Sequence, residues 1–417
     1  MPSSTRREEH DVVVVGGGPA GVCAAIASSR GGADTVLIEQ LGSLGGMASA
    51  AMFQPWRGFH SFGKQLVAGI AEEIVKHLQS AGGSPGHLLD PTGVGFTVTP
   101  FDHEMLPSVL RKLVEAEHVK LILDAQFVDT QKTGGIVDSI RIHRREGDIS
   151  LSANVFIDAT GNGAVAVNAG TRHVKHDAGA SYRFSMDHVD EKALLEYAQK
   201  NPHEFSGPAS IKGTDFLSLK GFTALTRDWR NAAPELKPSD SIQIDGTVRK
   251  GEVVVSMIGL PNVDMADPES LVRADMRCRQ LAPKAAAFLV DHCPGLAGAK
   301  IHAEALQAGF HASRQICSRM MISDSDVMSG RIFDDAIATC AMPGRPTSTF
   351  QVPREALLVP GIENLLVAGR AILPPTALFA TNSQPASMQL GEAAGEIACE
   401  LAGKLTNKKL RRDGERN

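Results

Sequence analysis

Residues 12–21 read Val-Val-Val-Val-Gly-Gly-Gly-Pro-Ala-Gly, and this stretch decides the fold. The β-branched run at 12–15 predicts a buried parallel strand, and the six residues after it match the pattern G-x-G-x-x-G. The small residues at 22–27 predict a helix that packs closely on a sheet, and residues 35–38 predict a second strand that ends at Glu39. Strand, glycine turn, helix, strand and acid in this order predict a Rossmann-type dinucleotide-binding unit.

Each part of this motif has a physical role. Gly16 allows the tight turn, Gly18 lets the backbone approach a pyrophosphate, and Gly21 lets helix and strand pack closely. The helix N-terminus offers free N–H groups to phosphates, and the Glu39 carboxylate would accept hydrogen bonds from a ribose, which disfavours a 2′-phosphate there. The dinucleotide contacts predicted from this unit are Gly16, Gly18, Pro19, Ala20, Gly21, Glu39 and Gln40.

Three later segments favour FAD over NAD. Residues 41–49 contain a glycine pair followed by Met47, which would keep the backbone open beside a long ligand; an ordinary glycine-rich loop is the alternative. Residues 155–163 read Val-Phe-Ile-Asp-Ala-Thr-Gly-Asn-Gly and predict a strand that returns to the same sheet. Residues 364–370 predict another buried strand, and a helix at 390–398 would present its positive N-terminus to the flavin pyrimidine.

The motifs G-x-G-x-x-G…E, L-G-G-M-A-S, I-D-A-T-G, R-x-F-D-D-A-I, N-L-L-V-A-G-R and L-G-x-A-A-G occur in order along most of the chain. Together they resemble the FAD-dependent oxidoreductase family, whose fold is built on the flavin half of the glutathione reductase type. The resemblance implies an α/β fold: a Rossmann-like FAD-binding domain with an inserted, β-sheet-containing substrate domain. It also implies non-covalent FAD, with the adenine near the first motif and the isoalloxazine near Gly369, Arg370 and residues 385–389. The further FAD contacts implied are Gly45, Gly46, Met47, Phe127, Val128, Ala159, Thr160, Gly161, Gly369, Arg370, Ser387, Met388 and Gln389.

The predicted domains are discontinuous. We expect 1–83, 101–170 and 307–417 to form the FAD-binding domain, 84–100 to enter the substrate domain, and 171–306 to be that domain. A second G-x-G-x-x-G is absent from the sequence, so the separate NAD domain of disulfide reductases is not expected. A transient partner, or NAD(P)H bound without its own Rossmann unit, would then exchange electrons with the flavin.

Composition excludes several classes of function. A net charge of −5 gives no basic field for nucleic acid, and six cysteines without a C-x-x-C pair disfavour metal and dithiol centres. The first apolar run, 12–15, is too short for a signal peptide or a membrane span, so we expect a cytoplasmic protein with no membrane partner. We expect the C-terminal tail to be disordered and solvated, with the basic residues Lys408, Lys409, Arg411 and Arg412.

Candidate catalytic residues lie outside the dinucleotide motifs. Arg57 would bind a substrate carboxylate in a bidentate manner, and His60 would move a proton near neutral pH; a surface loop is the alternative for both. Tyr182 would donate a proton beside the flavin, or would simply be a core residue. A covalent link to His, Cys or Tyr is not expected, because no attachment motif stands out.

The segment at 307–314 departs from the family pattern. Relatives show G-x-R-x-x-R, whereas this chain keeps Gly309 and Arg314 but has His311 at the position of the first arginine. Similarly, Asn382 stands where many relatives carry arginine. Both replacements either reflect structural drift or indicate a less acidic substrate. His311 and Arg314 remain candidate catalytic residues.

Three functions remain open at this point. The first is a dehydrogenase or reductase that acts on a small organic molecule by hydride transfer through flavin N5. The second is an NAD(P)H-dependent flavin monooxygenase, although Arg370 stands where hydroxylases of this fold class typically have Asp. The third is a flavin subunit that passes electrons within a complex, which the full-size substrate block disfavours. The chain would be a monomer or a homodimer.

Overall fold

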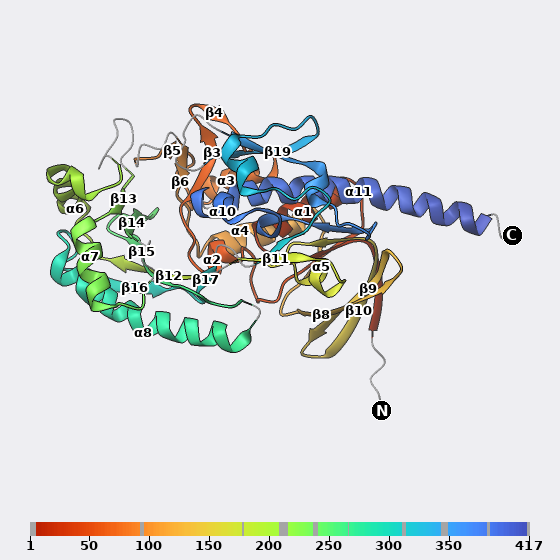
Figure 1. Ribbon diagram of the computed structural model, residues 1–417, viewed down its shortest axis with the longest axis horizontal. Helices are drawn as coiled ribbons and strands as arrows, with labels where there is room; N and C mark the ends of the chain where they lie inside the picture. Colours follow the sequence, from red (N-terminus) through yellow and green to blue (C-terminus); the bar gives the residue numbers. More distant parts are fainter. Residues whose placement is uncertain are drawn as a thin grey trace.

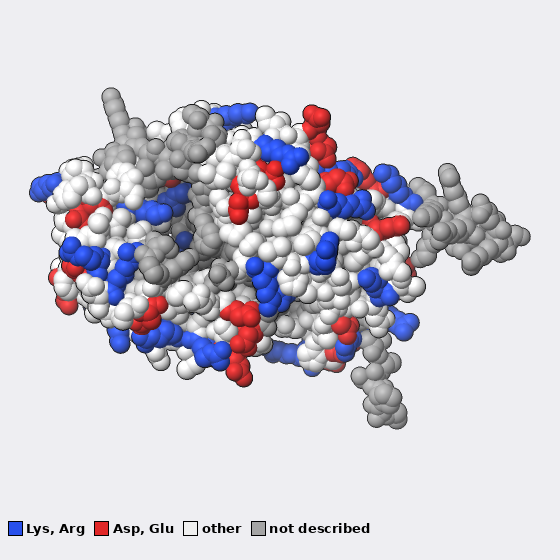
Figure 2. Space-filling view, viewed as in Figure 1, with Lys and Arg blue, Asp and Glu red and all other residues white. Residues whose placement is uncertain are grey.

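A computed structural model gives the arrangement of the chain (Figure 1). The green and teal segments of the predicted substrate block lie at one end, and the red, yellow and blue segments lie at the other. Positive and negative side chains are interspersed over the face seen in Figure 2. The structure describes residues 6–91, 96–176, 179–207, 216–236, 241–265, 267–310, 314–342, 349–381 and 384–414.

The largest sheet contains the predicted Rossmann unit. The valine run at its centre is fully buried, which explains why the strand carries apolar residues on both faces. An antiparallel hairpin, β8 (Gln126–Thr133) and β9 (Ile136–Arg144), extends the sheet from β10. The parallel strands lie in the order β7 (Lys120–Ile122), β2 (Thr35–Ile38), β1 (Arg6–Val15), β10 (Gly147–Asp158) and β21 (Leu365–Val367). This arrangement confirms the predicted α/β fold.

Two long helices from opposite ends of the chain cross beside this sheet. α1 (Pro19–Arg30) packs on α11 (Gln384–Gly414), and both are drawn side by side in Figure 1. A Cβ added to Gly391 would lie 2.0 Å from the carbonyl oxygen of Ala20, so the absence of a side chain permits this contact. The other helices of this part are α2 (Met47–Ala50), α3 (Ile70–Ser80), α4 (Leu106–Ala116), α5 (Ala164–Asn168), α9 (Asp324–Ser329) and α10 (Pro375–Thr381).

A second sheet has its own hydrophobic core. Tyr182, Phe184 and Phe222 are among its fully buried side chains, and α8 (Pro268–His292) packs against it. Its strands lie in the order β13 (Ser218–Gly221), β14 (Ile242–Gly246), β15 (Val253–Leu260), β12 (Ala180–Asp187) and β16 (Lys300–Glu304), and β17 (Gly309–Phe310) also pairs with β12. The helices α6 (Glu191–Lys200) and α7 (Thr223–Ala232) lie in the same stretch of sequence. This is the inserted sheet-containing part that the fold class predicts.

Smaller sheets complete the fold. One joins β4 (Lys64–Gln65), β3 (Trp56–Ser61), β6 (Phe96–Thr99) and β5 (Leu88–Leu89), and the others pair β11 (His173–Lys175) with β18 (Arg314–Ile316) and β19 (Ala336–Ala341) with β20 (Thr349–Pro353). Short 3₁₀ turns occur at η1 (Pro202–Glu204), η2 (Arg354–Leu357) and η3 (Gly369–Ile372). The exact domain boundaries remain predictions.

The C-terminal tail differs from its prediction. α11 continues as a helix to Gly414, and residues 415–417 lie outside the described part. Adding residues to an existing helix needs no new nucleus, and the Leu, Lys and Arg residues of this segment are good helix formers. In the part of the chain that the structure describes, no helix is long and apolar enough to cross a membrane.

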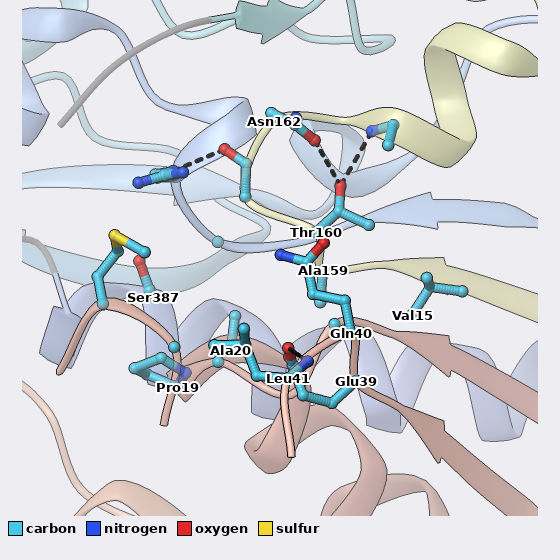
Figure 3. Close-up of a pocket in the computed structure, with 18 of the residues that line it drawn as sticks. Val15, Pro19, Ala20, Glu39, Gln40, Leu41, Ala159, Thr160, Asn162 and Ser387 are labelled. Carbon is cyan, nitrogen blue, oxygen red and sulfur yellow. Dashed lines mark hydrogen bonds between the residues drawn. The ribbon is translucent and has the colours of Figure 1, made fainter. Parts of the chain in front are cut away.

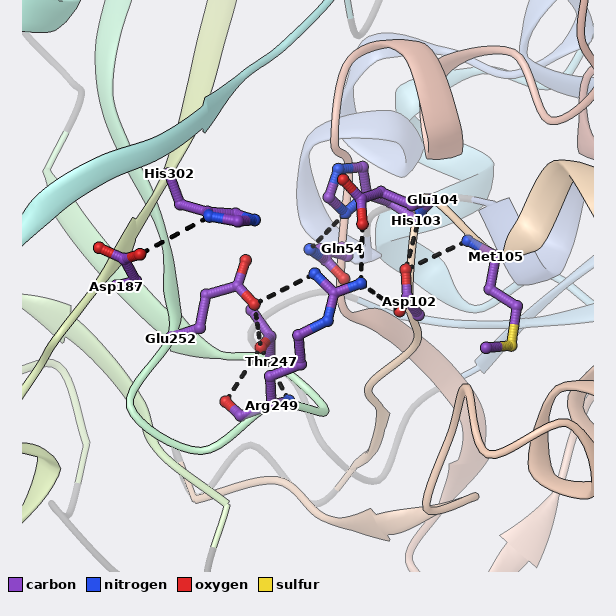
Figure 4. Close-up of polar contacts among 10 residues, drawn as sticks. All are labelled: Gln54, Asp102, His103, Glu104, Met105, Asp187, Thr247, Arg249, Glu252 and His302. Carbon is purple, nitrogen blue, oxygen red and sulfur yellow. Dashed lines mark hydrogen bonds and ion pairs between the residues drawn. The ribbon is translucent and has the colours of Figure 1, made fainter.

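One ionic cluster joins the two large parts of the molecule (Figure 4). The Arg249 guanidinium, in the turn between β14 and β15, lies 2.7 Å from Asp102 and 2.7 Å from Glu104, just before α4. It also lies 3.4 Å from Glu252 on its own turn. These carboxylates, with Glu104 first, raise the pKa of Arg249 above its ordinary value, although burial opposes the shift. These ion pairs therefore hold the β14–β15 turn of the second sheet to the segment just before α4.

Candidate functional site

A cavity follows the carboxyl ends of the parallel strands (Figure 3). Val15, Glu39, Ala159 and Ala368 line it, and each lies at or just after the end of a different strand of the large sheet. Ligands of open parallel sheets bind in this crevice, where loops and helix N-termini converge. The position of the cavity therefore agrees with a nucleotide site.

The glycine motif forms one wall of the cavity. A Cβ on Gly21 would lie 1.7 Å from the Gly16 carbonyl oxygen, and a Cβ on Gly16, whose φ is +111°, would lie 2.4 Å from that of Ala159. Around Gly18 the space is open, since the nearest atom to an added Cβ is 4.0 Å away. Pro19 begins α1 at a position that needs no N–H donor. Backbone N–H groups at the start of α1 can therefore reach a phosphate.

Glu39 forms the end of the cavity beyond β2. Its two carboxylate oxygens accept hydrogen bonds from the N–H of Gly17 at 2.6 Å and of Leu41 at 2.8 Å. The side chain is buried, and burial raises its pKa, while backbone N–H donors offset part of the rise. An ionised carboxylate has about four acceptor sites, so Glu39 can also accept hydrogen bonds from ribose hydroxyls. Gln126 and Phe127 line the cavity beside it.

The loop after β10 is held by Asp158. This buried carboxylate accepts from Thr160 Oγ1 at 2.6 Å and from the N–H of Ala166 at 2.8 Å, and burial raises its pKa. Figure 3 shows Thr160 and Asn162 at the cavity wall, where Thr160 Oγ1 lies 3.1 Å from the side-chain oxygen of Asn162. These hydrogen bonds fix the conformation of the loop that follows β10 and lines the cavity.

Arg370 links this loop to the second sheet. Its Nε donates to the Gly161 carbonyl at 2.7 Å, and a second nitrogen donates to the Phe310 carbonyl. Burial lowers the pKa of Arg370 to about 10, and no carboxylate among the described residues is paired with it. Because Arg370 lines the cavity, its charge is available to an anionic group of a ligand.

The far end of the cavity is apolar with amide groups. The lining there comes from Phe53 after α2, Phe310 on β17 and Gln384 at the start of α11, together with Met47 and Gln307. The Phe53 ring packs against Gly309, and the Arg183 guanidinium lies 4.3 Å from the ring centroid on a neighbouring strand. Sequence analysis predicted Met47 as a FAD contact. It missed the other four residues, because they follow no local motif and are brought together only by packing of the two sheets.

A family model described as FAD dependent oxidoreductase matches residues 11–410. The chain belongs to this family. Its cofactor is FAD, and the protein is a flavoenzyme of the oxidoreductase class. A search of curated protein sequences finds no significant match. The family assignment confirms the resemblance inferred from the motifs.

Several solved structures share the fold of this chain. A geranylgeranyl bacteriochlorophyll reductase-like protein from Thermoplasma acidophilum is 15% identical, with a TM-score of 0.55 over 97% of this chain and 84% of that chain. The p-nitrophenol 4-monooxygenase PnpA from Pseudomonas putida is 12% identical, with a TM-score of 0.51 over 97% and 82%. The flavin-dependent brominase Bmp2 is 13% identical, with a TM-score of 0.50 over 96% and 80%. At these identities, the similarity concerns the fold alone.

The residues of the cavity fit FAD. The open backbone at Gly18 and the start of α1 suit the pyrophosphate, and Glu39 suits the adenosine ribose. The apolar end at Phe53 and Phe310 suits the flat isoalloxazine. Along the cavity of this FAD-dependent oxidoreductase, the ribose, pyrophosphate and isoalloxazine sites follow one another in the order in which these groups are joined in FAD.

Most predicted FAD contacts line this cavity: Gly16, Gly18, Pro19, Ala20, Glu39, Gln40, Gly46, Met47, Phe127, Ala159, Thr160, Gly161, Gly369, Arg370 and Ser387. Five others do not. Gly21 packs on Gly16, Gly45 donates its N–H to the Gly17 carbonyl, and Val128 is 37% exposed. Met388 is buried, and Gln389 donates to the Leu66 carbonyl at 3.1 Å.

Arg57 has a different environment from the one predicted. Its guanidinium binds Asp90 at 3.0 Å and Asp245 at 2.8 Å, and donates to Ser218 at 2.9 Å. Burial alone would lower the pKa of Arg57, but the two carboxylates raise it above its ordinary value. The side chain is not among the cavity-lining residues, because these partners hold it between β3 and the second sheet. It acts as an ionic clamp in this structure.

The other candidate catalytic side chains that the structure describes are not among the residues that line the cavity. The His60 ring packs edge-on against His87 and lies within hydrogen-bond distance of Thr97 Oγ1. Burial lowers the pKa of His60. The Tyr182 hydroxyl lies 3.0 Å from both the Glu304 carboxylate and the Ala305 carbonyl, which share its single proton. Burial, together with the Glu304 hydrogen bond, raises the pKa of Tyr182 well above its usual value. Arg314 belongs to β18, which pairs with β11. His311 and Asn382 lie outside the described residues, so the predictions about them stand as they were.

Proposed function

We propose that this FAD-dependent oxidoreductase is a dehydrogenase or reductase that transfers a hydride between flavin N5 and a small organic molecule. One observation supports the proposal above the others: the cavity continues from Glu39, at the nucleotide end, to Phe53 and Phe310, beside the second sheet. A substrate that entered from that sheet would meet the isoalloxazine end of the cofactor. FAD supplies the hydride-accepting or hydride-donating atom, and the protein supplies orientation and exclusion of water.

The described side chains of the apolar end favour a substrate with little charge. Phe53 and Phe310 would contact its apolar part, and the amides of Gln307 and Gln384 would bind its polar atoms. Arg57, the predicted carboxylate ligand, is already paired with two aspartates. Among the described lining residues, only Glu39 and Arg370 are ionisable. We retain His311 as a proposed catalytic residue, since it directly follows Phe310 in the sequence.

A flavin monooxygenase that uses NAD(P)H as a transient reductant is the second candidate. It is favoured by the fold shared with the p-nitrophenol 4-monooxygenase over most of both chains. Arg370 argues against it, because it places a cation where the hydroxylase pattern has Asp. We rank it second for this reason, and we place an electron-transfer subunit without its own substrate third.

An absorption spectrum of the purified protein, before and after acid precipitation, is the first test. We propose that flavin absorption moves to the supernatant, as expected for non-covalent FAD. Flavin left in the pellet would instead indicate a covalent bond. Peptide mapping would then locate the modified side chain.

Anaerobic reduction distinguishes the two leading functions. In a dehydrogenase or reductase, a small-molecule substrate bleaches the flavin, or reoxidises flavin reduced by NADH or NADPH, in the absence of oxygen. In a monooxygenase, reoxidation of the reduced flavin in the presence of substrate requires O₂, and labelled oxygen appears in the product. A panel of small aromatic, amine and alkene compounds that produces neither response would contradict both proposals.

A further inference from the structure

Gln384 is a buried amide at the wall of the cavity. It is the first residue of α11 and is 8% exposed. Its Oε1 accepts a hydrogen bond from Trp56 Nε1 at 2.6 Å, although the two residues are 328 positions apart. Trp56 is fully buried, and its ring stacks on Phe101 with centroids 4.1 Å apart. The indole is therefore a rigid donor.

The Trp56 hydrogen bond determines which way the amide faces. An indole N–H can only donate, so the carbonyl oxygen of Gln384 must point at Trp56 and its NH₂ group must point away. That Nε2 atom is buried and has no hydrogen-bond partner in the described part of the chain. Buried donors are almost always satisfied, and leaving one unpaired is unfavourable. Since Gln384 lines the cavity, a molecule bound there can accept this hydrogen bond.

The start of α11 adds a second reason to expect an electron-rich ligand atom. The first N–H groups of a helix have no intrahelical acceptor, and the aligned peptide dipoles make this end positive. α11 is long, running from Gln384 to Gly414. The unpaired amide and the helix end therefore favour the same kind of atom, an oxygen or nitrogen acceptor with partial negative charge.

We propose that Gln384 donates a hydrogen bond from Nε2 to an acceptor atom of the molecule in the cavity, and that Trp56 is a positioning residue for this donor. The acceptor belongs either to a carbonyl of the flavin ring or to the substrate; the chemistry is the same in both cases. Only the substrate alternative rests on the function proposed above. Gln307 has no comparable constraint among the contacts of the described residues, so Gln384 is the residue with a defined orientation.

The test uses full-length protein loaded with FAD and three variants. Gln384→Met removes the donor and keeps the length of the side chain. Trp56→Phe keeps a buried ring and removes the N–H that orients the amide. Gln131→Met is the control, because Gln131 lies on β8 away from the cavity and contacts Ser139. Thermal unfolding of all three checks that they fold.

The flavin arm of the test needs no substrate. A donor to a flavin carbonyl stabilises the reduced cofactor more than the oxidised one, because negative charge develops on reduction. We expect Gln384→Met and Trp56→Phe to disfavour two-electron reduction by roughly fivefold, the effect of one hydrogen bond. This is a fall in midpoint potential of about 20 mV, at 29.6 mV per tenfold. The double variant should fall no further than Gln384→Met, because both changes remove one contact.

The substrate arm uses the compound that the anaerobic panel identifies. If the acceptor belongs to the substrate, the potential stays unchanged and the substrate dissociation constant rises by roughly fivefold in both variants. Either pattern, absent from Gln131→Met, supports the proposal. Unchanged potential with unchanged substrate binding, or an equal effect in the control, would overturn it. If the panel yields no substrate, the function proposal fails, and the flavin arm then decides alone: a lower potential in both variants supports the role of Gln384, and an unchanged potential overturns it.

Discussion

The carboxylate of Glu39 accepts a hydrogen bond from the backbone N–H of Gly17 at 2.6 Å. The contact ties the end of the second strand to the glycine turn after the first, across 22 residues of sequence. The acid is thereby held in place before any ligand arrives. Glu39 also lines the cavity, and its carboxylate has acceptor sites beyond those used by the backbone.

Replacing Glu39 by Gln should weaken FAD binding. An amide has one acceptor atom in place of two, so its NH₂ would meet a backbone N–H of Gly17 or Leu41. Hydrogen bonds to a charged group contribute about 1.5–3 kcal/mol, and we expect the FAD dissociation constant to rise by roughly ten- to a hundredfold. Titration of apo-protein with FAD measures this. The exposed Glu115→Gln, on α4, is the matched control.

FAD affinity should also depend on pH through Glu39. Burial raises the pKa of this carboxyl in the apo-protein above 4.5, so its ionised form destabilises the apo fold, and this penalty disappears as pH falls to the unfolded value. Ribose hydroxyls bind the ionised form better. Affinity for FAD should therefore increase as pH rises from 4.5 through the raised pKa. A pH profile that keeps the same slope in Glu39→Gln would contradict this assignment.

The buried ionic clamp at Arg57 should be important for stability. Arg57→Met leaves Asp90 and Asp245 without their shared cation, and removing one partner of a buried ion pair costs about 3–5 kcal/mol. Urea unfolding measures the change in the free energy of unfolding. Arg111→Met serves as the control, because Arg111 is exposed and its pair with Glu115 contributes less than about 0.5 kcal/mol. Equal stability of the two variants would show that the clamp is dispensable.

The contact of α1 with α11 should not tolerate a methyl group at Gly391. The added Cβ would lie 2.0 Å from the Ala20 carbonyl oxygen, so the helices must separate, which costs about 1–3 kcal/mol and shifts the start of α1 at the cavity. Gly403→Ala, in the same helix, has no atom within 4 Å of its Cβ and should stabilise the protein by up to about 1 kcal/mol. Thermal unfolding should show a lower melting temperature for Gly391→Ala and a higher one for Gly403→Ala, and FAD titration should show weaker binding in Gly391→Ala only.

Arg249 should control the local motion of the second sheet more than global stability. It is 42% exposed, so solvent screens its ion pairs and Arg249→Ala should cost less than about 1 kcal/mol. We expect faster amide hydrogen exchange in the β14–β15 turn and near Asp102, because the ionic link between them is lost. Arg273→Ala removes pairs only within the start of α8 and should leave that exchange unchanged. Slow exchange in Arg249→Ala would show that apolar packing alone holds the turn.

The sequence alone determined the nucleotide end of this protein. Residues 12–21 and Glu39 predicted the dinucleotide site. A backbone that must approach a pyrophosphate needs glycine at set positions, and these constraints act within one short segment. The order of the later motifs then indicated FAD and the family. The inserted sheet was expected from the change of pattern after about residue 170.

Only the tertiary structure decided the substrate end. Arg57 has the side chain expected of a ligand for a substrate carboxylate. Its partners Asp90 and Asp245 come from other elements, and they neutralise the charge of its guanidinium. The orientation of Gln384 depends on Trp56, far away in sequence. Local patterns cannot reveal such pairs, because which side chains meet is set by how two sheets and a C-terminal helix pack together, and packing joins residues that are distant along the chain.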